Sequence, residues 1–302
     1  MGITPAMLRM LVREVRQRNL QGAALTLGTQ DVWANETDVA RTLRTEGAVP
    51  RPFTSRPTTS ALFAQLGNED ARLAQYIHAR SLFEMLGFPE YVDLDNSDRD
   101  SPTLSHDLNE SLPDSLTGRF DLVVDFGTGE HVFRVDNVLV SVAAAAKAGG
   151  VIIHSLPLPC AHWAQHGYYC FNPDVLWDFY TKNGFSDITC KIIYYEKPWG
   201  RPVDHRIYFT SAKTFDYRPG IRLGFIVPPT AVSVVWFSAR KTDARRDLVI
   251  PVQQEHRPAT ALASSRFRPL LRRVFFSAQP FAGPLLRRAY LRAEGLSLAK
   301  IV

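Results

Sequence analysis

The pattern of apolar and polar positions is clearest in the middle of the chain. An apolar run, Leu122–Val124, ends at Asp125, and a second apolar run covers Val151–His154. Between them lie a glycine-containing loop with an acid and a histidine, a helix-like segment and a Gly-Gly turn. This succession predicts a doubly wound α/β sheet, which binds ligands beyond the carboxyl ends of its strands. We therefore expect the chemistry of the chain at Asp125–His131 and in the loop after His154.

Similar patterns divide most of the chain into helices and strands. Helices are predicted over residues 3–20, 37–44, 70–86, 137–147 and 172–183. Strands are predicted over residues 23–28, 91–94, 106–109, 121–125, 151–154, 188–195 and 232–238. The last two strands would suit an antiparallel hairpin. Residues 46–68 are rich in Pro, Thr, Ser and Arg, which predicts an irregular insertion, with a mobile lid as one role for it.

Length and composition fit one α/β domain with extensions. At 302 residues the chain can bury a large core, and no apolar run approaches the roughly 20 residues needed to cross a bilayer. The N-terminal segment interleaves charges with apolar residues, which predicts an amphipathic helix and not a signal peptide. The three cysteines, Cys160, Cys170 and Cys190, form neither an even framework nor a metal pattern. They indicate buried or partly buried thiols in a reduced, cytoplasmic protein.

The basic character of the chain is concentrated at its C-terminal end. Residues 263–302 hold eight Arg or Lys and one acid, so the net charge of this segment is +7. The net charge of the whole chain is +5, so the remaining residues carry about −2. We expect a domain over residues 1–250, followed by a linker and a basic amphipathic helical tail over 251–302. Such a tail can lie on an anionic surface, here the inner face of the cell membrane, or pack on the domain or on a homodimer partner. No nucleic-acid reader motif accompanies the basic residues, so nucleic acid is not an expected partner.

Five motifs occur in a fixed order along the chain. They are LGTQDV (27–32), DNS (95–97), HDLN (106–109), DFGTGEHVF (125–133) and HGYYCFNPDVLWDFYTKNGF (166–185). With these motifs the chain resembles the class I S-adenosylmethionine-dependent methyltransferases over roughly residues 5–210, and within them a bacterial subgroup associated with surface-glycan genes. The resemblance implies a mostly parallel, seven-stranded, Rossmann-like sheet. It also implies S-adenosylmethionine as the cofactor.

The resemblance places the cofactor at the ends of the first four strands. Asp95, or Asp93 before it, would hold the ribose hydroxyls, and Asp107 or its neighbouring backbone would hold the adenine amino group. Turn formation and helix capping are the alternatives for these acids. The full predicted cofactor set is Gly28, Thr29, Gln30, Asp95, Asp107, Leu108, Asp125 and Gly127.

The first loop departs from the family pattern. Class I methyltransferases carry a sequence close to GxGxG there, whereas this chain has Gly28 followed by Thr29 and Gln30. Side chains would therefore stand where the methionine part of the cofactor lies. Either the loop takes another path, or cofactor binding is weak or lost.

Two histidines and an acid are the candidate catalytic groups. His131, with Glu130 beside it, could take a proton from an acceptor hydroxyl, because imidazole titrates near physiological pH. His166 lies in a long aromatic loop, in which Tyr168 and Tyr169 could bind an acceptor such as a sugar. The alternative is that Glu130 caps backbone amides and His131 packs on the sheet. His162 and His166 stand four residues apart, but no regular helix is predicted there, so no metal is expected.

These expectations combine into one favoured function and two alternatives. The favoured function is O-methylation of a saccharide or another hydroxylated small molecule. The first alternative is a non-catalytic methyltransferase-like partner or scaffold in glycan assembly, which the glycine-poor loop favours. The second is a nucleotide-sugar-modifying enzyme on a dinucleotide-binding fold, against which the absence of GxGxxG argues.

Overall fold

A nine-stranded sheet forms the centre of the computed structural model. The model describes residues 2–66, 75–164, 166–196, 207–208, 211–221, 223, 226–228, 231–243, 248–252, 292, 296 and 299–300. Five strands are parallel and lie in the order β5 (Leu104–Ser105), β4 (Glu90–Asp95), β2 (Ala23–Leu27), β6 (Phe120–Asp125) and β7 (Ala146–Pro157). Four further strands extend the sheet, each antiparallel to its neighbour: β10 (Val232–Lys241), β8 (Phe185–Tyr195), β9 (Ala212–Asp216) and β11 (Ala299–Lys300).

The order of the parallel strands is that of a doubly wound sheet. Numbered along the chain, the five parallel strands lie in the spatial order 3-2-1-4-5, which is the order of the Rossmann-type fold. The chain leaves β2 toward β4 and β5, and then returns to the other side of β2 to form β6 and β7. The topological switch point therefore lies between β2 and β6, where such sheets place their ligands.

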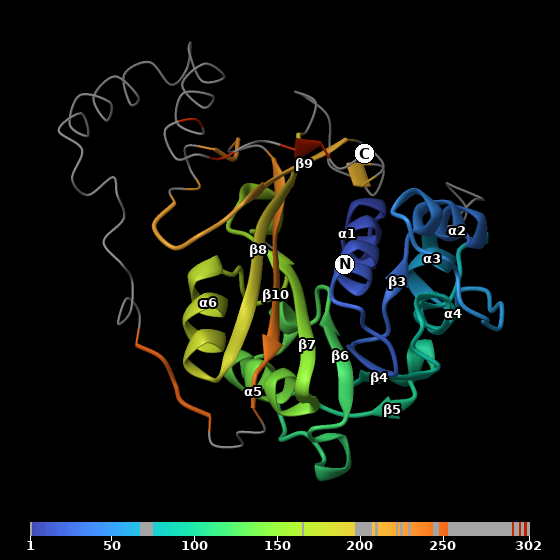
Figure 1. Cartoon of the computed structure of the whole chain (residues 1–302), viewed down its shortest axis with the longest axis horizontal. Helices are drawn as coiled ribbons and strands as arrows, with labels where there is room; N and C mark the ends of the chain where they lie inside the picture. Colours follow the sequence, from blue (N-terminus) through green and yellow to red (C-terminus); the bar gives the residue numbers. More distant parts are fainter. Residues whose placement is uncertain are drawn as a thin grey trace.

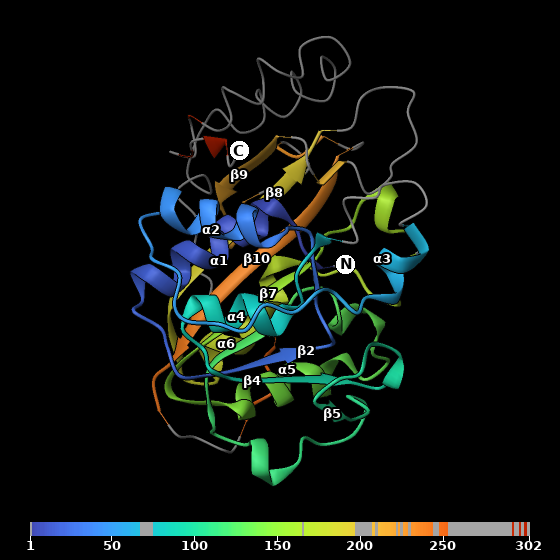
Figure 2. The ribbon, with the colours of Figure 1, turned by 90° about the vertical axis from the view of Figure 1, so that its right-hand side faces the viewer.

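Helices cover both faces of the sheet. One face packs against α1 (Pro5–Gln17), α2 (Glu36–Thr45) and α4 (Ala79–Leu86), and the other packs against α5 (Val135–Ala145) and α6 (Pro173–Lys182). Figure 1 shows the two groups on opposite sides of the strands, and Figure 2 shows α1, α2 and α4 in front of them. The strand side chains alternate between the two resulting cores, as for Leu122 and Val124 on one face and Val123 on the other.

Local sequence explains where these helices begin and end. Thr4, Asn35 and Asn172 each accept a hydrogen bond from a backbone amide in the first turn of α1, α2 and α6, respectively. Pro5 and Pro173 occupy first helical positions, where a missing amide hydrogen is tolerated. At the C-terminal end of α4, Gly87 has a φ of 102°, a left-handed conformation that favours glycine.

The register of the parallel strands aligns their carboxyl ends. Leu27 pairs with Leu94 on one side and with Asp125 on the other, and Asp125 pairs with His154. Thus the residues that follow β2, β4 and β6 emerge along one edge of the sheet, and the polar side chains predicted to form the site are brought to that edge.

Most predicted elements are confirmed. The α/β class, the doubly wound and mostly parallel sheet, the N-terminal helix, and the helices predicted over residues 37–44, 137–147 and 172–183 are all present, with ends shifted by a few residues. The strands predicted over 23–28, 91–94, 121–125, 151–154, 188–195 and 232–238 are present as β2, β4, β6, β7, β8 and β10.

Some predicted elements are wrong. The described part of segment 70–86 is helical only from Ala79, because Tyr76 and Ile77 form bridges with other segments. Residues 106–109 are a turn that follows β5, and the predicted insertion contains the helix α3 (Ala61–Leu66). The sheet has nine strands and not seven, because β9 and β11 extend its antiparallel edge. Since β9 lies between β8 and β10 in the sequence, these two strands pair without forming a hairpin.

A short parallel pair, β1 (Gly2–Ile3) and β3 (Asp31–Val32), forms a second sheet beside the start of α1. This sheet was not predicted.

Two predicted segments are described only in part. Most of the predicted basic tail lies outside the described residues, as does the start of segment 70–86. Among the described helices, none has the length and apolar character that a membrane span requires.

Candidate functional site

The turn after β2 is closed by side chains. Gly28 has a φ of 72°, and a Cβ at this position would lie 2.5 Å from Oγ1 of Thr128. That hydroxyl donates a hydrogen bond of 2.7 Å to the carbonyl of Leu27. The side chain of Thr128 therefore occupies the space beside Gly28. Its hydrogen bond joins the turn after β2 to the turn after β6.

Thr29 and Gln30 fold back over the same edge of the sheet. The backbone amide of Thr29 donates to Oδ2 of Asp95 at 3.1 Å, and its hydroxyl donates to Oδ2 of Asp93 at 3.0 Å. Nε2 of Gln30 donates to the carbonyl of Leu27 at 2.6 Å, and the side chain is buried. These contacts place side chains in the first turn, as the missing glycines led us to expect.

The two acids in the last part of β4 have different surroundings. Asp93 is buried, and besides Thr29 it accepts hydrogen bonds from both the amide and the hydroxyl of Thr103. Asp95 is half-buried, and its Oδ1 accepts a bond from the amide of Ser97 at 2.9 Å. Each oxygen of Asp95 accepts one backbone amide and keeps a second lone pair. Asp95 is therefore the better placed of the two to bind hydroxyl groups of a ligand.

Asp107 and Leu108 lie in the turn after β5. Oδ1 of Asp107 accepts hydrogen bonds from the amide and the side chain of Asn109, and these bonds lower the pKa of Asp107. Leu108 is buried in the core beneath α5, and its carbonyl accepts a bond from the side chain of Asn137. Asp107 stays accessible, whereas the side chain of Leu108 serves packing.

Both carboxylate oxygens of Asp125 contact other groups of the protein. Oδ1 accepts hydrogen bonds from the amides of Thr128 and Gly129, at 3.0 and 3.2 Å. Oδ2 lies 3.1 Å from Nδ1 of His154, whose Nε2 lies 2.5 Å from the hydroxyl of Tyr180. Asp125, His154 and Tyr180 are fully buried. Asp125, which the sequence predicts to bind the cofactor, thus fixes the turn that carries Glu130.

Glu130, His131 and His166 form a cluster at the same edge. Oε1 of Glu130 lies 3.6 Å from Nε2 of His166 and 3.9 Å from Nε2 of His131. The two imidazole rings meet edge to face, with centroids 4.8 Å apart. Glu130 is 0% exposed, and 47% of the His131 side chain is exposed. The structure therefore brings together the three predicted catalytic residues, with the carboxylate beneath the imidazoles.

The aromatic loop is fastened to the cluster through its backbone. The amides of Tyr168 and Tyr169 both donate to the carbonyl of Glu130, at 2.7 and 3.2 Å. Gly167, with a φ of 73°, lies so close that a Cβ there would be 2.7 Å from the same carbonyl. His166 is held at this position because three consecutive residues after it pack onto Glu130.

Two exposed aromatic rings stand beside the histidines. Tyr168 and Phe133 are exposed, and their rings meet edge to face with centroids 6.0 Å apart. The hydroxyl of Tyr169 donates to the carbonyl of Phe133 at 2.8 Å. Phe133 was not predicted as a site residue, although it ends the motif that contains Glu130 and His131.

Burial sets the charge of His131. Loss of hydration lowers its pKa from the ordinary histidine value, and this effect exceeds the opposing attraction of Glu130. The imidazole of His131 is therefore neutral at physiological pH and can accept a proton or bind a cation.

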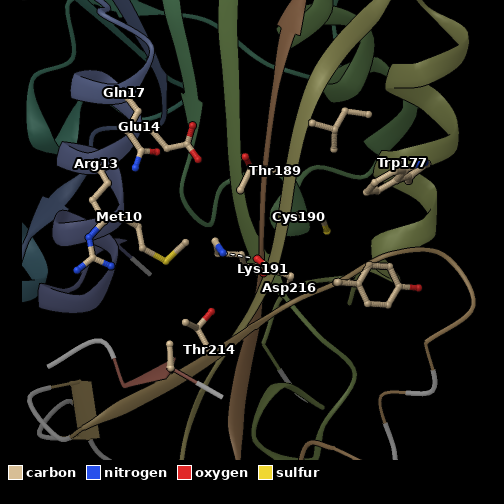
Figure 3. A pocket seen from close by; sticks show the side chains of 13 residues that line it. Met10, Arg13, Glu14, Gln17, Trp177, Thr189, Cys190, Lys191, Thr214 and Asp216 are labelled. Atoms are coloured by element: carbon tan, nitrogen blue, oxygen red, sulfur yellow. Dashed lines mark hydrogen bonds and ion pairs between the residues drawn. The ribbon is translucent and has the colours of Figure 1, made fainter. Parts of the chain in front are cut away.

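A separate cavity of ≈ 460 Å³ lies at the other end of the sheet. It is lined by α1, α6, β8 and β9, and Figure 3 shows Arg13 and Glu14 on one wall and Trp177 opposite. Lys191 and Asp216 form an ion pair within it. Its β8 residues come early in a strand that runs parallel to β7, so the cavity lies away from the carboxyl ends that carry the site. We assign it no role.

The three cysteines have the surroundings that were predicted. Cys190 is buried, and Cys160 and Cys170 are half-buried, all as free thiols. Burial raises the pKa of Cys170 and of Cys190. These thiols are thus poor nucleophiles near neutral pH.

The site accommodates S-adenosylmethionine in part. Asp95 and Asp107 offer acceptor oxygens beside β4 and β5, which suits the ribose and adenine of such a cofactor. Beside β2, the side chains of Thr29, Gln30 and Thr128 occupy the first turn, where the family pattern has glycine. The residues present fit the adenosine half, whereas side chains fill the first turn on the methionine side.

In comparisons with known proteins, the chain is similar only to solved structures. No family model matches the chain, and no curated protein matches it. A methyltransferase from Archaeoglobus fulgidus, described as dependent on S-adenosylmethionine (SAM), is 13% identical with a TM-score of 0.36, and the match covers 77% of this chain and 94% of that one. A SAM-dependent methyltransferase from Thermotoga maritima is 10% identical with a TM-score of 0.35, over 77% of this chain and 89% of that one.

A third solved structure carries a bound cofactor. It is phosphoethanolamine N-methyltransferase 2 of Haemonchus contortus in complex with S-adenosylmethionine, 12% identical with a TM-score of 0.40, over 78% of this chain and 52% of that one. At these identities and TM-scores the likenesses do not decide the activity of this chain.

Proposed function

We propose that this protein is an S-adenosylmethionine-dependent methyltransferase that acts on a hydroxyl oxygen of a small molecule such as a saccharide. The observation that carries the proposal is the cluster of Glu130, His131 and His166 at the edge of a doubly wound sheet, beside its switch point. The strand order and the five sequence motifs both support it.

Cofactor binding is assigned to the edge formed by β2, β4 and β5. Asp95 would accept hydrogen bonds from the ribose hydroxyls with the lone pairs that its backbone amides leave free. Asp107 would face the adenine. The bound cofactor would supply an electrophilic sulfonium methyl group.

The acceptor side is assigned to the histidines and the exposed rings. The neutral imidazole of His131 would accept the hydroxyl proton, and His166 would hold the acceptor next to it. Tyr168 and Phe133 offer exposed faces on which a sugar ring can lie. Most of the rate acceleration would come from positioning, because methyl transfer requires chiefly an in-line approach.

One observation favours a second function, that of a non-catalytic methyltransferase-like partner in glycan assembly. Thr29 and Gln30 form hydrogen bonds to Asp95, Asp93 and the end of β2, so their own side chains fill the first turn. A protein that had lost cofactor binding would have this closed first turn.

Calorimetry with S-adenosylmethionine and S-adenosylhomocysteine separates the two functions. The enzyme should release or absorb heat and gain thermal stability with either ligand, and no response at millimolar ligand would reject it. If binding is found, methyl transfer to a panel of sugars should fall by about 10²–10⁴-fold in His131→Ala, the range expected for loss of a general base. His162→Ala, a change on the same loop, is the control and should keep the wild-type rate.

A further inference from the structure

The carboxylate of Glu130 has no hydrogen-bond partner in the described part of the chain, although it is fully buried. Both of its oxygens lack a partner, and so does Nε2 of His166. A buried carboxylate without partners is costly, and buried polar groups in folded proteins are nearly always satisfied. A cation between the carboxylate and the imidazole would satisfy these atoms.

The three donor groups converge on one point. One ligand atom from each of Glu130, His131 and His166 lies within 4.8 Å of the other two. Bonds from Zn²⁺ to nitrogen and oxygen ligands of about 2.0–2.2 Å require donor atoms roughly 3–4 Å apart. The two distances from Glu130 Oε1, 3.6 and 3.9 Å, already fall in that range. Only the separation of the two half-exposed imidazoles has to shorten.

The backbone around the cluster holds the donors in place. The carbonyl of Glu130 accepts the amides of Tyr168 and Tyr169, which fixes His166 relative to Glu130. Asp125 accepts the amides of Thr128 and Gly129, which fixes the turn that carries Glu130 and His131. The indole of Trp163 lies beside His166, with ring centroids 4.9 Å apart. The donor set is thus part of a fixed structure and not a chance meeting of surface side chains.

We propose that Glu130, His131 and His166 bind one divalent transition-metal ion of the zinc class. Two imidazole nitrogens and one carboxylate form a donor set that zinc prefers, whereas Mg²⁺ and Ca²⁺ prefer oxygen alone. One ion bound between the three side chains would satisfy the carboxylate of Glu130 and Nε2 of His166 at once. This proposal differs from the expectation of no metal site, which considered His162 and His166 without Glu130.

The exposed side of His131 leaves room for a further ligand of the ion. Three protein ligands with an open position are the arrangement of catalytic zinc sites. A hydroxyl of the acceptor bound there would lose its proton more readily, as metal-bound water does, and His131 would then act as a ligand of the ion in place of the general base proposed above. This role rests on the proposed function, whereas the binding of the metal does not.

The test uses the untagged full chain, stripped of metal with a chelator and then titrated with Zn²⁺ by calorimetry. One ion should bind per chain, and His131→Ala and His166→Ala should each weaken binding by at least tenfold. His162→Ala should bind as the wild type does, since it shares the loop but lies outside the cluster. Co²⁺ used in place of Zn²⁺ should give a visible absorption spectrum that both cluster variants lose.

Three results would overturn the metal site: no Zn²⁺ binding by the wild type, binding unchanged in either cluster variant, or equal loss in His162→Ala. Circular dichroism of each variant checks that it is folded, and Glu130→Gln supplies a third variant that preserves shape. Failure of this test leaves cofactor binding untouched, because that is measured by the response to S-adenosylhomocysteine in metal-free buffer.

Discussion

His154 in β7 pairs with Asp125, the last residue of β6, and Nδ1 of the histidine lies 3.1 Å from Oδ2 of the acid. With the proton on Nδ1, the imidazole donates to Asp125, and Nε2 accepts a hydrogen bond from the hydroxyl of Tyr180. Because the other oxygen of Asp125 holds the turn at Thr128 and Gly129, this buried chain of contacts links α6 to the cluster at Glu130.

We expect His154→Ala to destabilise the protein more than Tyr180→Phe. Removing the imidazole leaves an oxygen of Asp125 unpaired in the core, which costs about 3–5 kcal/mol. Tyr180→Phe leaves Nε2 of His154 buried without a donor, which should cost about 1–3 kcal/mol. Urea unfolding measures both free energies. Equal costs for the two variants would contradict the central place of His154.

Gly28 should be intolerant of a side chain because of Thr128. Gly28→Ala adds a left-handed alanine and a contact of 2.5 Å with Oγ1 of Thr128. Gly118→Ala is a matched control, because Gly118 has a φ of 64° but nothing within 4 Å of its added Cβ. We expect Gly28→Ala to cost about 1–3 kcal/mol more than Gly118→Ala, the usual penalty for overpacking.

The excess cost at Gly28 should disappear when its neighbour is shortened. In a Thr128→Ala background the two glycine substitutions should cost the same free energy of unfolding, since only the backbone strain remains. A persisting difference between them in urea unfolding would place the clash elsewhere.

Glu46, next to the C-terminal end of α2, should make stability depend on pH. Arg13 donates from Nε and Nη2 to the two oxygens of Glu46, at 2.6 and 3.0 Å, and these bonds lower the pKa of Glu46. Because the folded-state pKa lies below the unfolded value of about 4.3, the stabilisation is complete above that value. It is lost as the pH falls through the lower, folded-state pKa.

We therefore expect Glu46→Gln to reduce stability at neutral pH by about 0.5–1 kcal/mol, as for a partly exposed ion pair. At pH values below the folded-state pKa the variant and the wild type should be equally stable. Urea midpoints measured from pH 7 to pH 2 give both curves. Parallel curves over the whole range would show that Glu46 has no shifted pKa.

The fold could be predicted because its signals are local. Apolar runs ended by an acid, as at Leu122–Asp125, gave the central strands, and Asn172 with Gly184 marked the limits of α6. The errors arose where distant segments decide the structure. Tyr76 and Ile77 continue a helical pattern, but they pair with Asn35 and Pro57, contacts that no local pattern reveals.

The residues of the site could be predicted from the sequence, but the contacts between them could not. Glu130, His131 and His166 belong to two separate motifs that the sequence marks as candidates, and the fold brings them together. His154 was missed as a partner of Asp125, although a polar residue in a buried strand opposite an acid is a recognisable signal. The burial of Glu130 could not be foreseen, because it depends on the loop at Gly167–Tyr169 packing onto its backbone.

The closed first turn leads to a prediction about cofactor affinity. The side chain of Gln30 contacts the carbonyl of Leu27, which Thr128 also satisfies, so Gln30→Gly leaves that carbonyl paired. Thr29 is a poorer choice, because its hydroxyl is a partner of the buried Asp93. If Gln30 fills the space of the methionine group, Gln30→Gly should strengthen S-adenosylhomocysteine binding by at least about tenfold, equivalent to about 1.4 kcal/mol. Calorimetry measures the two affinities, and Gln21→Gly, an exposed position before β2, is the control. An unchanged affinity in Gln30→Gly would mean that the ligand approaches the sheet without meeting this side chain.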